Sequence, residues 1–237
     1  MAEMRFRDRR EAGLRLAARL QRYRRRPRTV VLGLPRGGVP VAAEVARQLE
    51  LPLDVIISRK LGAAENPEFA IGAVAEGGEV YLNPEGVDSA GAAPADVAAS
   101  AARQREEIAR RQRLFRDGEL LALPPGATVL LVDDGIATGS TVIAAIHALR
   151  RQGVARIVLA VPVAPPDTVE HLRPMVDELV VLLAPALFFA VGAFYEDFAQ
   201  VSDDEVRERL EEAARDGRRS GAGKTRPVTR AAPRGSP

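Results

Sequence analysis

The sequence of 237 residues contains no cysteine, no tryptophan and only two histidines. Without cysteine the chain cannot form disulfides, use a thiol nucleophile or bind zinc through thiolates. His147 and His171 stand far apart along the chain, so we do not expect a histidine-based metal centre. Aromatic residues are scarce at 4%, but hydrophobic residues reach 46%, which is enough for a sizeable core.

Long hydrophobic runs are also missing. No run approaches the roughly 18 apolar residues that a membrane-spanning helix needs. The N-terminus, MAEMRFRDRREAG, is charged where a signal peptide would be apolar. These features predict a cytoplasmic protein without a membrane partner.

The formal net charge of +2 hides an uneven distribution. Residues 1–28 hold eleven arginines against three acidic residues, and residues 216–237 are also basic, whereas the middle of the chain is acidic. A protein that binds nucleic acid usually carries its positive charge on the folded domain. We therefore do not expect nucleic acid to be the main partner.

Strand and helix patterns alternate along the chain. Continuous apolar runs predict buried strands at 29–34, 53–57, 128–132, 156–163 and 178–183. Helices are expected at 39–50, 96–116, 139–152 and 166–173, and shorter β structure around Gly77–Gly78. This alternation predicts an α/β fold with a mostly parallel twisted sheet flanked by helices.

The ends of the chain and one internal segment complete the expected organisation. Residues 6–25 place Leu16, Leu20 and Tyr23 on one helical face, with Ala12 a turn earlier. Residues 84–95 are rich in Gly, Ala and Pro and are expected to form a loop. We expect one domain over 1–215 and a disordered basic tail over 216–237.

The segment TVLLVDDGIATGST, residues 128–141, has the most unusual composition. Asp133 and Asp134 follow a buried strand, and adjacent carboxylates repel unless a cation or a hydroxyl-rich ligand lies between them. Unpaired amides at the start of the next helix bind anions, and Gly139 would let a phosphate approach closely. Phosphate and vicinal hydroxyls held this close together describe a ribose 5-phosphate. The alternative is an ordinary turn in which Thr or Ser caps the helix.

This segment resembles the phosphoribosyl diphosphate (PRPP) binding motif of the type I phosphoribosyltransferases. The resemblance implies that Asp133 and Asp134 hold the ribose and that residues 137–141 hold the 5-phosphate. Those five residues are Ala137, Thr138, Gly139, Ser140 and Thr141. It also implies Mg²⁺ carried by PRPP, which Asp133 and Asp134 could contact, and a homodimer.

Two further loops follow predicted strands and fit the same resemblance. In LPRGGVP, residues 34–40, the resemblance implies that Arg36, Gly37 and Gly38 bind the departing pyrophosphate. Family members often have a strained, sometimes cis, peptide in this loop, which would fall at Arg36–Gly37. In SRKLGAAENPEF, residues 58–69, Arg59 and Lys60 would begin a mobile active-site loop that contacts pyrophosphate. Tight turns and solvated charges are the structural alternatives for these two loops.

The family uses a C-terminal hood over the ribose to recognise the acceptor. Residues 184–206 would supply this hood here, and Phe188, Phe189 and Tyr195 are candidates for stacking on a base. In the hypoxanthine/guanine branch of the family, the position of Ala137 is an aspartate that assists proton transfer. Alanine cannot do this, so that branch is not expected.

These residues predict a phosphoribosyltransferase that transfers ribose 5-phosphate from PRPP to a nitrogen nucleophile such as a nucleobase. Its catalytic residues would be Arg36, Lys60, Asp133 and Asp134. Two alternatives stay open: a PRPP-sensing regulator that binds nucleic acid through its basic ends, and a protein with a vestigial site.

Overall fold

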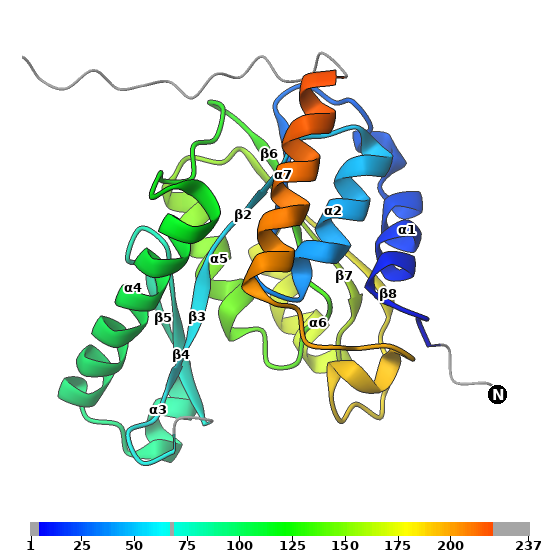
Figure 1. The fold of residues 1–237 in the computed structure, drawn as a ribbon. Coiled ribbons are helices and arrows are strands. Elements are labelled where there is room, and N and C mark those ends of the chain that lie inside the picture. Colours follow the sequence, from blue (N-terminus) through cyan, green and yellow to red (C-terminus); the bar gives the residue numbers. More distant parts are fainter. Residues whose placement is uncertain (1–4, 67–68, 220–237) are drawn as a thin grey trace, which may run out of the picture.

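The computed structural model describes residues 5–66 and 69–219. At its centre is a five-stranded sheet with the strand order β2-β1-β6-β7-β8 (Figure 1). All pairings within this sheet are parallel, so the predicted mostly parallel sheet is confirmed. The strands are β1 (Thr29–Gly33), β2 (Leu53–Val55), β6 (Thr128–Val132), β7 (Arg156–Val163) and β8 (Glu178–Leu183).

Helices cover both faces of this sheet, which explains why its strands are continuous apolar runs. Alternate residues of β6 face opposite sides: Leu130 packs with α1 and α2, and Leu131 packs with α5 and α6. The helices are α1 (Arg9–Arg19), α2 (Gly38–Leu49), α5 (Ser140–Arg151) and α6 (Pro166–Leu172), the last followed by the short turn η2 (Arg173–Met175).

The N-terminal helix packs through the stripe that its sequence predicts. Ala12, Leu16 and Leu20 are fully buried, and Tyr23, in the following turn η1 (Gln21–Tyr23), is 1% exposed. Asp8 caps the helix by accepting a hydrogen bond from the Glu11 amide at 2.7 Å.

A second, antiparallel sheet projects from the main body together with α3 and α4 (Figure 1). It contains β3 (Ser58–Gly62), β4 (Ala70–Ala75) and β5 (Val80–Leu82). The mobile loop expected at 58–69 therefore begins as a strand, in which Ser58 pairs with Ala75.

The expected loop at 84–95 is wrong. The structure has α3 (Pro84–Ala90) and the start of α4 (Pro94–Arg116) there. Each proline stands in the first turn of its helix, where the missing N–H costs nothing, and Gly91 ends α3 with a φ of 56°. The Pro and Gly residues therefore mark helix boundaries.

The segment after β8 contains the turn η3 (Val191–Phe194) and the final helix α7 (Asp203–Arg219), which lies beside α2 in Figure 1. Because α7 runs to Arg219, it includes the first four residues of the tail expected over 216–237, and residues 220–237 lie outside the described part. Within the described ranges, no helix combines the length and apolarity needed to cross a membrane.

Candidate functional site

The loops after β1 and β6 lie side by side because these two strands are neighbours in the sheet, with Gly33 paired to Val132. A Cβ on Gly37 would lie 2.0 Å from Asp134 Oδ2, and one on Gly38 would lie 2.9 Å from Asp133 Oδ1. Only glycine permits so close an approach between the backbone and the two carboxylates.

The loop after β1 contains a cis peptide bond between Pro35 and Arg36. The expected position, Arg36–Gly37, is therefore wrong by one residue. The Arg36 side chain is partly exposed, and its Nη1 lies 3.8 Å from Oδ1 of Asp203, the first residue of α7.

The first amides of α5 donate no hydrogen bond to a side chain of the N-cap residue. That residue is Gly139, whose φ of 79° is in the region that glycine adopts without a steric penalty. The alternative in which Thr or Ser occupies the N-cap is therefore not what the structure has. Ala137 and Thr138 are exposed and Ser140 is buried, so an anion could reach the loop from its open side.

Asp133 and Asp134 lie together in a half-buried setting. Asp133 Oδ1 accepts a hydrogen bond from the Asp134 amide at 2.9 Å, and Asp134 Oδ2 accepts one from Arg9 Nε at 2.8 Å. Burial and the Asp134 charge raise the pKa of Asp133 well above its usual range. Burial also raises the pKa of Asp134, and Arg9 opposes this shift. The protein therefore compensates the negative charge of the pair only in part. Hydroxyl donors from a ligand would stabilise the ionised form of both carboxyl groups.

A cavity of about 480 Å³ lies between β3, α4 and the two loops. Pro35 and Thr141 line it on the loop side. Ser58 Oγ is buried there and has no hydrogen-bond partner. The remaining polar walls come from Arg59, Lys60, Ser100, Arg103 and Gln104.

The charge around this cavity is mainly positive. Burial, and then Arg111, lower the pKa of Arg59, whose Nε donates to Gln104 Oε1 at 3.1 Å. A hydrogen bond from Arg110 lowers the pKa of Glu107 to about 2, so Glu107 stays ionised and neutralises Arg110 and Arg111. Arg59, Lys60 and Arg103 line the cavity, so its wall offers several positive charges to a ligand with several negative charges.

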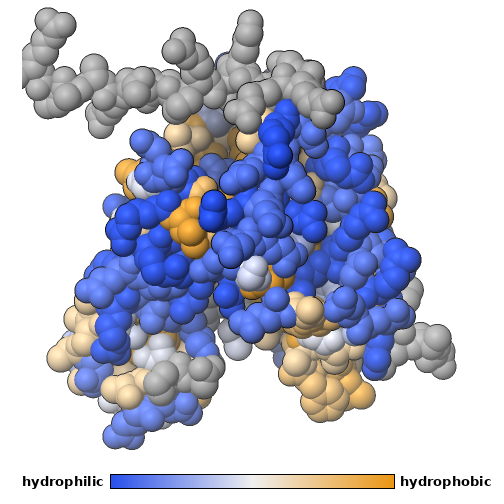
Figure 2. Space-filling view, in the orientation of Figure 1, coloured by the Kyte–Doolittle hydropathy of each residue, from blue (hydrophilic) through white to orange (hydrophobic). Residues whose placement is uncertain are grey.

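The structure separates the three hood aromatics. Tyr195 is 4% exposed and packs between Phe6 and Phe198, so its expected role in stacking on a base is wrong. Its hydroxyl instead donates to the Asp134 carbonyl at 2.6 Å. Phe188 stacks on Phe194, whereas Phe189 is 89% exposed. Figure 2 shows an apolar surface at its lower right, where Figure 1 draws the yellow to gold segment after β8. Stacking by Phe188 or Phe189 stays a prediction.

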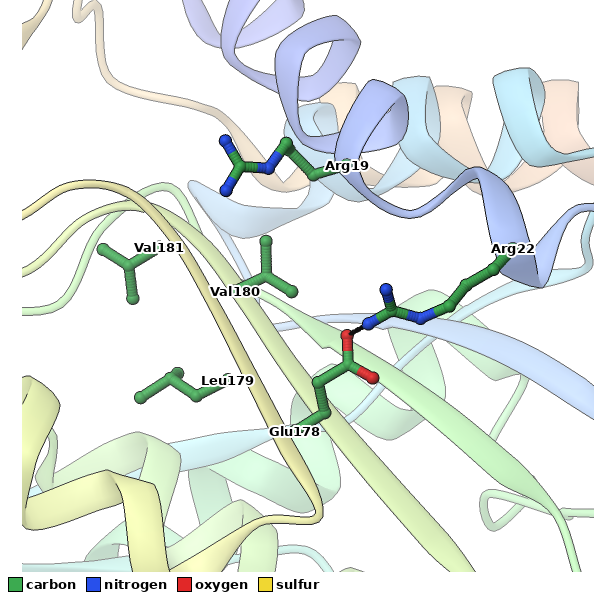
Figure 3. Close-up of a pocket in the computed structure, with 6 residues that line it drawn as sticks. All are labelled: Arg19, Arg22, Glu178, Leu179, Val180 and Val181. Carbon is green, nitrogen blue, oxygen red and sulfur yellow. Dashed lines mark hydrogen bonds and ion pairs between the residues drawn. The ribbon is translucent and has the colours of Figure 1, made fainter.

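A second cavity, of about 270 Å³, lies between α1 and β8 (Figure 3). Arg22 forms an ion pair with Glu178 beside it, and Val180 packs into the core under α1 and α2. Glu178 begins β8, so this cavity lies at the amino end of its strand, away from the loops that follow β1 and β6. Ligands of such sheets bind at the carboxyl ends, so we do not assign the candidate site to this cavity.

Several residues of the site have no signal in the sequence. Arg9 stands 125 positions before its partner Asp134. Ser100, Arg103 and Gln104 share one face of α4 at helical spacing, but that spacing does not tell what the face meets.

Comparisons with known proteins identify the family of this chain. The family model described as "Phosphoribosyl transferase domain" matches residues 9–182. A protein of Mycobacterium tuberculosis (strain ATCC 25618 / H37Rv), which carries the name "Putative phosphoribosyl transferase", is 46% identical over 217 residues. That match covers 92% of this chain and 49% of the relative, so the chain spans about half the length of the curated relatives it matches.

A solved structure matches most of this chain and nearly all of its own length. The crystal structure of TT1426 from Thermus thermophilus is 47% identical, with a TM-score of 0.72, and the match covers 88% of this chain and 99% of that one. Because the family model matches well over half of the chain, this protein belongs to the phosphoribosyl transferase domain family.

Proposed function

We propose that this protein transfers ribose 5-phosphate from PRPP to a nitrogen nucleophile, with a nucleobase as the acceptor class, and releases pyrophosphate. The observation that carries the proposal is the meeting of three features at one edge of the sheet. These are the uncapped start of α5, the acidic pair, and a cavity walled by cations.

The 5-phosphate would bind in the loop 137–141. Amides at the start of α5 and the hydroxyls of Thr138, Ser140 and Thr141 would donate to its oxygens. Asp133 and Asp134 would accept hydrogen bonds from the ribose hydroxyls, which lie next to the 5-phosphate in the same ligand.

The pyrophosphate of PRPP would bind on the opposite side of the ribose. Gly37 and Gly38 would approach it with their backbones, and Arg36, Arg59 and Lys60 would supply positive charge. Arg59 and Lys60 line the cavity that also reaches Pro35 and Thr141, which supports one continuous ligand.

Magnesium fits this site as a companion of the ligand. Among the residues that the structure describes, no group of three or more His, Cys, Asp or Glu side chains could hold a metal ion. Mg²⁺ is often bound by one or two carboxylates together with substrate phosphates, and Asp133 and Asp134 could fill that role. When bound, it would neutralise charge on the leaving pyrophosphate.

In the proposed reaction, the bond between C1′ and the pyrophosphate oxygen breaks and a bond from the acceptor nitrogen to C1′ forms. The bonding electron pair leaves with pyrophosphate, and the acceptor nitrogen releases its proton to the departing pyrophosphate or to water. Ala137 offers no carboxylate to take this proton. The residues of the site would therefore act by orienting the donor, excluding water and stabilising the leaving group.

The proposal is tested by measuring pyrophosphate release from PRPP with a panel of bases and amides. Acceptor-dependent release supports the transferase. Tight PRPP binding without release, together with salt-sensitive binding of nucleic acid, would favour the regulator instead. Several N-terminal arginines are already paired within the chain, as Arg22 is with Glu178 and Arg24 with Glu50, which weighs against the regulator.

Replacing Gly37 by alanine is expected to weaken PRPP binding about tenfold or more, because the new methyl group would displace the Asp134 carboxylate. The backbone of Gly37 is in the right-handed helical region, so alanine itself adds no backbone strain. Isothermal titration with PRPP and Mg²⁺ measures the effect.

Gly77→Ala is the control for this variant. Gly77 has a φ of 87° and open space around its Cβ position, so alanine there should lower the free energy of unfolding by about 1–2 kcal/mol and leave PRPP affinity unchanged. Equal affinity of the Gly37→Ala variant and the wild type would reject the proposed contact between the two loops and the ligand.

A further inference from the structure

The start of the N-terminal helix reaches directly into the acidic loop. Arg9, the first residue of α1, donates from Nε to Asp134 Oδ2 at 2.8 Å. Both side chains are largely buried, with 12% and 13% of their surfaces exposed. Exposed ion pairs contribute little, but a pair shielded from water in this way holds a defined geometry.

Two further contacts fix the Arg9 guanidinium. Its Nη1 donates to the carbonyl of Ala199 at 2.8 Å, and its Cζ lies 3.9 Å from the centroid of the Phe198 ring. Both partners belong to the segment between η3 and α7. The guanidinium plane is thus held by the hood side while one edge is directed at Asp134.

These contacts leave the two oxygens of Asp134 in different environments. Oδ2 is bound by Arg9 and lies where a Cβ on Gly37 would collide with it. Oδ1 is the oxygen that Arg9 does not bind, and a Cβ on Gly37 would lie 3.1 Å from it. The Arg9 bond to Oδ2 therefore fixes the orientation of the Asp134 carboxylate and with it the position of Oδ1.

The same hood segment is tied to the N-terminus and to the acidic loop. The Phe6 amide donates to the Phe194 carbonyl and the Glu196 amide donates to the Phe6 carbonyl, both at 2.8 Å. Tyr195 donates to the Asp134 carbonyl at 2.6 Å. Arg9 thus lies where three segments distant in sequence meet, and Asp134 is their common point.

We propose that Arg9 is a positioning residue of the phosphosugar site. As a built-in counter-ion it fixes the Asp134 carboxylate so that Oδ1 and the Asp133 carboxylate receive the ribose diol. It also offsets one negative charge of the acidic loop, which lessens repulsion of a ligand that is itself a polyanion. This inference rests on the proposed function and assigns a role to the arginine-rich N-terminus.

The test compares Arg9→Met with Arg9→Lys. Methionine keeps an unbranched apolar stem on the Phe198 ring and loses the charge, so PRPP affinity should fall about 10- to 100-fold in titration calorimetry. Lysine keeps the charge but cannot reproduce the fork that contacts Asp134 and Ala199, so its affinity should lie between those of Arg9→Met and the wild type. Arg10→Met is the control on the same helix turn. The Arg10 side chain is 71% exposed and its ion pair with Glu44 is long, at 3.8 Å, so this variant should bind PRPP like the wild type.

A second measurement separates positioning from a general loss of structure. The wild type should bind ribose 5-phosphate about tenfold more tightly than 2-deoxyribose 5-phosphate, because the acidic pair accepts from the diol. In Arg9→Met this ratio should fall towards one, whereas the affinity for inorganic pyrophosphate, which has no diol, should fall less than the affinity for ribose 5-phosphate. A merely structural role would weaken all three ligands alike.

The outcomes are distinguishable. If the wild type binds PRPP and Arg9→Met keeps both its affinity and its discrimination against the deoxy sugar, the role of Arg9 is overturned and the proposed function survives. If Arg9→Lys binds PRPP as weakly as Arg9→Met, the positive charge contributes nothing and the counter-ion role of Arg9 is overturned. If the wild type binds neither PRPP nor ribose 5-phosphate, the proposed function falls and the inference falls with it.

Discussion

Replacing Asp133 and Asp134 together by asparagine is expected to lower PRPP-dependent turnover at least about 100-fold. A hydrogen bond to a charged group contributes about 1.5–3 kcal/mol, and the double variant removes the charge from both acceptors of the ribose diol. The loss should affect binding as well, because free PRPP already carries the diol. Titration calorimetry and a pyrophosphate-release assay measure the two effects.

The stability of the variants shows whether a loss of binding comes from the missing carboxylates or from a damaged fold. Burial and the Asp134 charge raise the pKa of Asp133, so the folded state holds its proton more tightly than the unfolded state does. Protonated Asp133 therefore adds to the free energy of unfolding at acidic pH. This contribution is lost as the pH rises above the ordinary pKa of a carboxyl group and through the raised pKa of Asp133. Asparagine has no such titration and can still accept the hydrogen bond from the Asp134 amide.

The single variant Asp133→Asn should consequently match or exceed the wild-type thermal midpoint near neutral pH while binding PRPP more weakly. Its advantage in midpoint should grow from acidic to neutral pH. A variant that keeps wild-type affinity, or that loses affinity only in proportion to lost stability, would contradict the role of Asp133 as a ligand-binding carboxylate.

Removing the Glu76 carboxylate is expected to destabilise the fold by about 3–5 kcal/mol, because it removes the carboxylate that is hydrogen-bonded to a largely buried arginine. Glu76 is 3% exposed and forms an ion pair with Arg116, the last residue of α4, whose Nε also lies 3.6 Å from Asp54 Oδ1. Arg116 Nε and Nη1 have no hydrogen-bond partner. Glu76 follows β4, so the pair joins the antiparallel sheet to the end of α4.

Chemical denaturation of Glu76→Ala measures this effect. Glu79→Ala is the control in the same hairpin, because Glu79 pairs with Arg151, which is 72% exposed, and should change the free energy of unfolding by less than about 1 kcal/mol. Replacing both partners with apolar residues, as in Glu76→Leu with Arg116→Met, should recover most of the lost stability. Equal stability of Glu76→Ala and the wild type would show that the ion pair does not hold the two elements together.

The central sheet was predictable because its strands are covered on both faces. Complete burial requires continuous apolar runs, and such runs at 128–132 and 156–163 coincide with β6 and β7. The approach of the loop after β1 to the loop after β6 also follows from a parallel sheet, whose strand ends share one edge.

The departures from prediction have local physical causes. Pro84, Gly91 and Pro94 are residue types that are common in loops. In this chain they stand at helix ends, where Pro84 and Pro94 begin helices and Gly91 ends one. Tyr195 was a candidate for base stacking because it stands in an aromatic cluster. Its neighbours Phe6 and Phe198 enclose it instead, and Phe6 comes from the other end of the chain.

The residues that sequence reasoning missed act through long-range contacts. Arg9 becomes meaningful only when α1 is placed on the sheet and its first turn meets the acidic loop. Arg103 and Gln104 contribute to the cavity only because α4 packs over β3. No local pattern encodes such a meeting, whereas the PRPP-like motif is local and can be identified from its spacing.

The most direct test of the central claim is a crystal structure of the wild-type protein with PRPP and Mg²⁺. We predict density for the 5-phosphate against the amides that open α5 at Ser140 and Thr141, with the ribose hydroxyls within hydrogen-bond distance of Asp133. Pyrophosphate density should extend towards Gly37, Gly38 and Lys60. A loop that stays empty at millimolar PRPP, or a ligand bound away from the acidic pair, would contradict the account.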